Sequence, residues 1–160
     1  MRGAPLLLLL LAGCAARPNT PSLLPRGIEN QSEAVQVPPA PPVEADPVIN
    51  TRITQAQASL AATARTFAGF HAQAEALVEA ARGKPAGSEP WLTAQAALGD
   101  LDVLRAQSSS DATDLELLMI ERAGLGKPPY PGLDEAYRAA QAQYEEQSRA
   151  IAALSAQLPS

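Results

Sequence analysis

The chain has 160 residues, a net charge of −5 at pH 7, 46% hydrophobic residues and one cysteine. An acidic chain of this composition offers no basic patch for a phosphate backbone, so we expect no nucleic-acid partner. A lone cysteine cannot form a disulfide within the chain, which excludes a disulfide-stapled scaffold.

The first 13 residues have the three parts of a secretory signal, namely a positive charge, an apolar run and small residues before a cleavage point. The charge is Arg2, and the apolar run is the leucine stretch 6–11. This run is about half as long as the roughly 20 residues needed to cross a bilayer. We therefore expect a processed signal and not a membrane span.

The segment Leu11–Cys14 has the sequence Leu-Ala-Gly-Cys, which resembles the lipobox of bacterial lipoproteins. The resemblance implies that residues 1–13 are a signal peptide, and that Cys14 becomes the first mature residue. It also implies a diacylglycerol on the Cys14 thiol and a fatty acyl chain, such as palmitate, on its amine. In this class an aspartate after the cysteine favours the inner membrane, whereas here Ala15 follows. The resemblance thus implies a lipid-anchored envelope protein of the outer membrane, facing the periplasm.

Residues 14–46 form a proline-rich segment, here called the tether, in which apolar residues follow no helical period. Proline removes a backbone donor and clashes with the preceding turn, so no helix is expected. We predict a disordered or polyproline-like linker that reaches about 100 Å when fully extended and roughly 30 Å as a flexible coil. The run 33–37 alternates apolar and polar residues, and addition to a partner's sheet edge is its alternative role.

A first helix is predicted over residues 47–82. Asp46 is placed to cap it, Pro47 suits its first turn, and Gly83 can adopt the left-handed conformation that ends a helix. Its seam positions alternate in steps of four and three residues, which is the spacing of a coiled coil. They are Ile49, Ile53, Ala56, Leu60, Thr63, Phe67, Phe70, Ala74, Leu77 and Ala81.

A second helix is predicted over residues 89–123, with Ser88 as its cap. Gly124 is expected to end it, with Leu125 making the apolar contact that follows a glycine cap. The polar stretch 108–111 in its middle is a poor helix former. We favour one long helix because the heptad period continues across this stretch. The alternative is a helix that bends or breaks there. Its apolar positions are Trp91, Ala94, Leu98, Leu101, Leu104, Leu115, Leu118 and Met119.

A third helix is predicted over residues 133–158, after a short, stiff loop that holds three prolines. Its seam again alternates in steps of four and three, through Leu133, Tyr137, Ala140, Tyr144, Gln147, Ile151, Leu154 and Leu158. Thr63 and Gln147 are polar seam residues, and buried polar groups of this kind can fix the register of a bundle.

Helices joined by short connections run in alternating directions. The sequence therefore predicts an all-α fold in which residues 47–160 form an elongated antiparallel three-helix bundle with coiled-coil-like heptad packing. The alternative is a helical hairpin or open bundle that completes its core as a homo-oligomer, because alanine-rich seams bury little area.

The sequence carries no pattern that indicates catalysis. It contains no nucleophile turn, phosphate loop or dinucleotide fingerprint. His71 is the only histidine and has no second histidine or free cysteine with which to share a metal. The second helix carries a group of carboxylates, for which a solvated face is favoured over a divalent-cation site: Asp100, Asp102, Asp111, Asp114 and Glu116. We expect no enzyme activity, metal or cofactor.

Two aromatic residues near the ends of the bundle are candidates for partner binding. Trp91 is the only tryptophan, a residue type enriched in binding hot spots, and Tyr130 lies in the proline loop. For both residues, packing over the end of the core is the favoured role. The leading hypothesis is a non-enzymatic envelope lipoprotein that binds or scaffolds an unknown envelope protein. The alternative is a binding module for a small ligand or cell-wall component near Trp91.

Overall fold

The computed structural model describes residues 43–159. The expected signal peptide, Cys14 and nearly all of the tether lie outside the described residues. Residues 43–159 fall within one compact unit and contain three helices, α1 (Pro47–Ala81), α2 (Glu89–Gly124) and α3 (Pro131–Ser155), with no strand among them. The all-helical class predicted from the sequence is confirmed for this part of the chain. None of the described helices is both long and apolar enough to cross a membrane.

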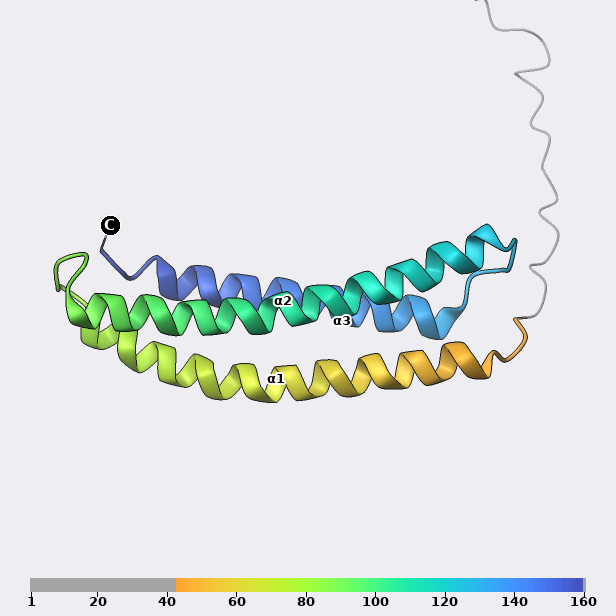
Figure 1. The fold of residues 1–160 in the computed structure, drawn as a ribbon, viewed down its shortest axis with the longest axis horizontal. Coiled ribbons are helices and arrows are strands. Elements are labelled where there is room, and N and C mark those ends of the chain that lie inside the picture. Colours follow the sequence, from red (N-terminus) through yellow and green to blue (C-terminus); the bar gives the residue numbers. More distant parts are fainter. Residues whose placement is uncertain (1–42, 160) are drawn as a thin grey trace, which may run out of the picture. The chain divides into compact units, whose positions relative to one another are not determined.

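The three helices pack against one another, and each contacts both of the others. In Figure 1, α1 and α3 run in one direction and α2 runs in the opposite direction. Two contacts between helix ends agree with this arrangement. The backbone N–H of Asp46, before α1, donates to the Tyr130 hydroxyl before α3, at 3.5 Å. At the other end, the Trp91 indole N–H in α2 donates to the carbonyl of Pro159, after α3, at 2.9 Å.

The start of α1 has the expected side-chain cap. The start of α2 has the expected residue at the N-cap position, but that residue makes no capping hydrogen bond. The Asp46 carboxylate accepts a hydrogen bond from the N–H of Ile49 at 3.2 Å, and Pro47 opens the helix. Past the end of α1, Gly83 has a φ of 72°, the left-handed conformation expected there. Ser88 is the N-cap residue of α2, but its buried hydroxyl has no hydrogen-bond partner among the described residues.

The end of α2 differs from the expectation. Gly124 is still helical, and Gly126 has the positive φ, of 66°. The N–H of Lys127 donates to the carbonyl of Arg122 at 3.1 Å, which closes the turn around this glycine. Leu125 is exposed and does not make the apolar contact that the sequence predicted.

The third helix begins at Pro131, two residues before the expected start, and ends at Ser155, before the expected 158. Proline is well tolerated in a first helical turn, because its missing N–H would have no partner there. The carbonyl of Tyr130 accepts from the N–H groups of Leu133 and Asp134, at 2.9 and 3.1 Å. Pro131 therefore belongs to the helix and not to the loop.

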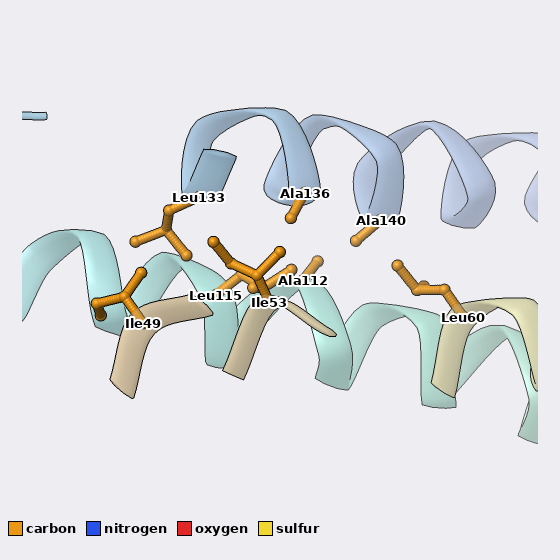
Figure 2. Close-up of a cluster of buried hydrophobic side chains, with 8 residues drawn as sticks. All are labelled: Ile49, Ile53, Leu60, Ala112, Leu115, Leu133, Ala136 and Ala140. Atoms are coloured by element: carbon orange, nitrogen blue, oxygen red, sulfur yellow. The ribbon is translucent and has the colours of Figure 1, made fainter. Parts of the chain in front are cut away.

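Apolar side chains from all three helices form two clusters along the bundle. Figure 2 shows the first, near the start of α1, where the leucine and isoleucine side chains fill the space beside alanines of α2 and α3. Its members are Ile49, Ile53, Leu60, Ala112, Leu115, Leu133, Ala136 and Ala140. The second cluster lies toward the end of α1 and comprises Phe67, Ala74, Val78, Ala81, Ala94, Leu98, Leu101 and Leu154. Small alanines alternating with larger side chains allow the close interdigitation on which helix packing depends.

After Phe67 the seam of α1 departs from the prediction at alternate positions, while the predicted Ala74 and Ala81 are fully buried. Phe70, a predicted seam residue, is 41% exposed, whereas Val78 is 1% exposed and was not predicted to be buried. His71, the residue after Phe70, is partly buried, and its ring stacks on Phe67 with centroids 5.9 Å apart. A straight helix has 3.6 residues per turn, so a strict 3.5 repeat drifts and an extra step of four restores the contact. The sequence pattern concealed this because Phe70 and Leu77 also fit an unbroken heptad repeat.

The middle of α2 is a continuous helix, although its sequence is polar. Ser108 and Asp111 are both buried, and both accept hydrogen bonds from other helices. The buried position of Asp111 corrects its assignment to the solvated acidic face. The other four carboxylates of that group are exposed, as predicted: Asp100, Asp102, Asp114 and Glu116.

Gln147 is the polar residue most enclosed in the α3 seam. It is 3% exposed, and neither its Oε1 nor its Nε2 has a hydrogen-bond partner among the described residues. It lies in sequence between Ala140 of the first cluster and Leu154 of the second. An unpaired buried amide costs free energy that an apolar side chain of similar size does not.

Replacing Gln147 with leucine is expected to raise the free energy of unfolding by about 1–3 kcal/mol, because the unpaired amide is removed and apolar volume is kept. Urea unfolding followed by circular dichroism measures this change. Gln141→Leu is the matched control, since the Gln141 amide donates to the Tyr137 hydroxyl at 2.8 Å and lies outside both clusters. A loss of stability in Gln147→Leu would show that the amide has a partner in solution.

Candidate functional site

A cluster of polar side chains connects the three helices near the middle of the bundle. The Ser59 hydroxyl in α1 donates to both carboxylate oxygens of Asp111, at 3.2 and 2.9 Å. Gln107, one turn before Asp111 in α2, donates to the same carboxylate at 3.3 Å. These donors satisfy the carboxylate, so its burial does not leave an uncompensated charge.

A second part of this cluster joins α3 to the other two helices. The Gln143 amide donates to the Ser108 hydroxyl at 3.0 Å and to the backbone carbonyl of Leu60 at 3.2 Å. Leu60 belongs to the first apolar cluster, and Ser108 is fully buried. A single amide therefore bridges all three helices, which favours one relative alignment of the bundle over others.

A small pocket of about 190 Å³ opens between α1 and α2 beside this cluster. It is lined by Arg52, Gln55, Ala56, Ser59, Asp111, Asp114, Leu115 and Leu118. Its volume is below the several hundred Å³ of a typical small-molecule site. Its carboxylates come from Asp111, which is already hydrogen-bonded, and from the exposed Asp114.

No group of three or more histidine, cysteine, aspartate or glutamate side chains placed to hold a metal occurs in the part of the chain that the structure describes. His71 lies on α1 with its Nδ1 3.7 Å from the Glu75 carboxylate, one turn further along the same helix. Its ring packs on Phe67. The surroundings of this histidine are therefore those of a residue at the edge of the core.

Tyr130 lies in a polar group at the end of the bundle where α1 begins, here called the Asp46 cluster and consisting of Asp46, Asn50, Arg122, Lys127 and Tyr130. The Tyr130 hydroxyl donates to Oδ1 of Asn50 at 2.7 Å. Its ring lies under the guanidinium of Arg122, 5.1 Å from the ring centroid.

Arg122 is the buried centre of the Asp46 cluster. Its side chain is 8% exposed, and its Nε donates to the carbonyl of Pro128 at 2.6 Å. Its guanidinium lies 3.5 Å from Oδ2 of Asp46, and the Lys127 ammonium lies 3.8 Å from the same oxygen. The cluster therefore ties the start of α1 to the end of α2 and to the loop before α3. Through these contacts Tyr130 connects the loop before α3 to Asn50 and Arg122.

Trp91 lies at the opposite end of the bundle from Tyr130. It is half-buried in the first turn of α2, and its indole N–H donates to the Pro159 carbonyl. Arg82 and Gln157 form a further contact at this end, at 2.9 Å, between the segments that follow α1 and α3. The indole therefore holds the C-terminal segment against α2. The structure does not bring the two candidate aromatics together, and Cys14 lies outside the described residues.

Sequence reasoning missed one surface feature. Four large aliphatic side chains of α2 are more than half exposed: Leu92, Val103, Leu117 and Ile120. They are 11, 14 and 3 residues apart and fall on one row of positions at alternating steps of four and three along the helix. The sequence already contained this period, but we assigned it only to the buried face. Buried and exposed apolar positions can be separated only once the contacts among the helices are known.

No protein-family model matches the sequence, and no match was found among curated proteins or solved structures.

Proposed function

We propose that this protein is a lipid-anchored, non-enzymatic lipoprotein of the bacterial cell envelope, which presents an elongated antiparallel three-helix bundle with coiled-coil-like packing to another envelope protein. The proposed anchor is Cys14, which ends the lipobox-like segment Leu-Ala-Gly-Cys. Ala15 at the following position supports placement in the outer membrane, facing the periplasm. The signal peptide is residues 1–13, and the bundle follows the tether of residues 14–46.

Two or three acyl chains on Cys14 would hold the protein stably at a membrane, because each buried methylene contributes about 0.8 kcal/mol. The tether would then allow the bundle to work at a distance from the lipid surface, up to about 100 Å if fully extended. A partner in a neighbouring envelope layer is within this range.

The observation that carries the interaction role is the exposure of large aliphatic side chains on α2. Val103 is 69% exposed and Ile120 is 60% exposed. Leaving such side chains in water forgoes about 1.5–3 kcal/mol of burial each, so their alignment along one side of α2 favours a partner that covers it. The polar groups at both ends and in the middle of the bundle are, by contrast, engaged within the chain itself.

Replacing Cys14 with serine is expected to abolish metabolic labelling by radioactive palmitate, because a hydroxyl does not take the thioether-linked diacylglycerol. The variant should appear as soluble or unprocessed protein after membrane fractionation. Ser22→Ala, in the tether, is the control and should label like the parent chain. Labelling that persists in Cys14→Ser, or a processed Cys14→Ser chain that still fractionates with membranes, would refute the anchor.

The partner role is tested separately by cross-linking in intact cells, with a photo-reactive residue introduced at exposed positions on each of the three helices. Recovery of the same envelope protein from one helix face supports the role. Recovery of no protein from any face, with correct lipid labelling, would refute the partner role and leave the anchor standing.

A further inference from the structure

The outer face of α2 carries a second heptad pattern that the bundle does not use. From Leu92 to Gly124, the positions reached by alternating steps of four and three residues are all exposed, and none is charged. Large aliphatic side chains occupy four of its ten positions, at Leu92, Val103, Leu117 and Ile120. The other six positions hold small residues: Ala96, Gly99, Ala106, Ser110, Thr113 and Gly124. We call this row the α2 stripe.

The spacing of the α2 stripe indicates the shape of what would cover it. A 3.5-residue repeat keeps apolar positions in line with a second helix that winds alongside, and each side chain enters a gap between four residues of that helix. The small residues in the middle allow a close approach between helix axes, because the separation of packed helices depends on side-chain size at the contact. A long amphipathic helix therefore fits this face.

The charge on the borders of the stripe indicates which charge the side chains of the partner helix would carry. Carboxylates flank the stripe on both sides: Asp100, Asp114 and Glu121 on one side, and Asp102 and Glu116 on the other. All five are exposed. Of the two arginines of α2, Arg105 pairs with the flanking Asp102 at 3.0 Å, which leaves the other four carboxylates without an ion pair to an arginine of α2. Arg105 also donates to the Tyr144 hydroxyl in α3 at 3.0 Å, and Arg122 donates to Pro128.

A second copy of this chain is a poor match for the stripe. Two α2 helices packed through it would bring acidic borders together, and like charges at these flanking positions oppose pairing. Lysine or arginine at the flanking positions of the other helix would instead face these carboxylates. Such pairs select the partner and speed the encounter.

We propose that the α2 stripe is a docking surface for an amphipathic helix of another protein, whose apolar heptad row is bordered by lysine or arginine. This inference deepens the proposed function, on which it rests for the biological setting, by naming the chemistry of the partner. The binding mode is an added fourth helix along the outer side of α2.

The test uses the full chain, purified from membranes and placed in lipid nanodiscs, and two fluorescein-labelled peptides of four heptads each. Both peptides have leucine at the seam positions; one has lysine at every flanking position, and the other has glutamate. Fluorescence anisotropy should show the lysine peptide binding about tenfold or more tightly than the glutamate peptide, because flanking charges set partner choice. Affinity for the lysine peptide should also fall as salt is raised.

Variants locate the binding on the stripe. Val103→Asp and Leu117→Asp should each lower the affinity for the lysine peptide by about tenfold or more, since each places a charge in the apolar seam. Ala142→Asp is the matched control, because it adds the same charge at an exposed position of α3. The double variant Asp100→Lys and Asp114→Lys should reduce the preference for the lysine peptide, because the borders of the stripe then carry two positive and three negative side chains. Circular dichroism would confirm that each variant keeps its helix content.

Three results would overturn the proposal: no binding of the lysine peptide, equal weakening by Val103→Asp and Ala142→Asp, or an unchanged preference in the double lysine variant. Self-association that Val103→Asp abolishes would also overturn it, in favour of a second copy of the chain. Failure here leaves the proposed function open to its own tests, because acylation of Cys14 and cross-linking from other helix faces do not depend on the α2 stripe.

Discussion

The Leu101→Ala variant is expected to lose about 2–5 kcal/mol of its free energy of unfolding. Leu101 is fully buried in the second apolar cluster, which also contains the small side chains of Ala74, Ala81 and Ala94. Truncation removes buried methyl groups and leaves a cavity that these short side chains cannot fill. The loss is a large fraction of the stability of an ordinary small domain, so the unfolding midpoint should fall clearly.

Val103→Ala is the matched control, because Val103 is two residues away on the same helix and 69% exposed. Its expected change is within about 0.5 kcal/mol, as for most surface substitutions. Urea unfolding of both variants, followed by circular dichroism at 222 nm, gives the comparison. If Val103→Ala were as damaging as Leu101→Ala, the face of α2 that carries the α2 stripe would be buried in solution.

Arg122→Ala is expected to lower the free energy of unfolding by about 2–4 kcal/mol, since removing one partner of a buried ion pair leaves the other groups uncompensated. Arg122 pairs with Asp46, donates to the carbonyl of Pro128 and lies over the Tyr130 ring. Its loss therefore removes three contacts at once. The start of α1 and the loop before α3 should become the least protected parts of the bundle.

Hydrogen exchange, measured by mass spectrometry, checks this location, and urea unfolding checks the size of the effect. Arg105→Ala is the control, because the ion pair of Arg105 with Asp102 joins side chains that are 30% and 53% exposed. Exposed pairs contribute about 0–1 kcal/mol. Equal losses in the two variants, or faster exchange away from the Asp46 cluster in Arg122→Ala, would contradict the role given to Arg122.

The Asp46 cluster has a further consequence if Cys14 is the anchor. The tether joins α1 at Asp46, so any pull between the anchor and a bound partner enters the bundle at this residue. Asp46 caps α1 through Ile49 and is held by Arg122 and Lys127. The first turn of α1 is therefore tied to α2 and to the following loop at the point where force would act.

Much of the helical architecture follows from local sequence. A carboxylate before a proline starts α1, glycines with positive φ follow α1 and α2, and apolar residues at helical spacing form the seams. These signals are local because capping and backbone conformation depend on residues within one or two turns. The lipobox-like segment at Cys14 is also a local pattern, and it remains a prediction with a direct test.

Other features depended on contacts between residues distant in sequence. Whether Phe70 or Val78 faces the core depends on the drift of a straight helix against its neighbours. Asp111 is buried because its donor Ser59 lies on another helix, and sequence alone does not place the two side by side. Likewise, the partners of Tyr130 and Trp91 come from segments roughly 70–80 residues away in the chain.

The sequence by itself determined the helices, their approximate ends and the candidate anchor at Cys14, because each of these is encoded within a few neighbouring residues. The heptad pattern already placed Leu101 in the seam of α2, and only the tertiary structure showed that the α2 stripe on its other side is left exposed. Leu101 and Val103 are both aliphatic residues at heptad positions, yet one is fully buried and the other is exposed. That difference arises from which side of α2 the other two helices cover.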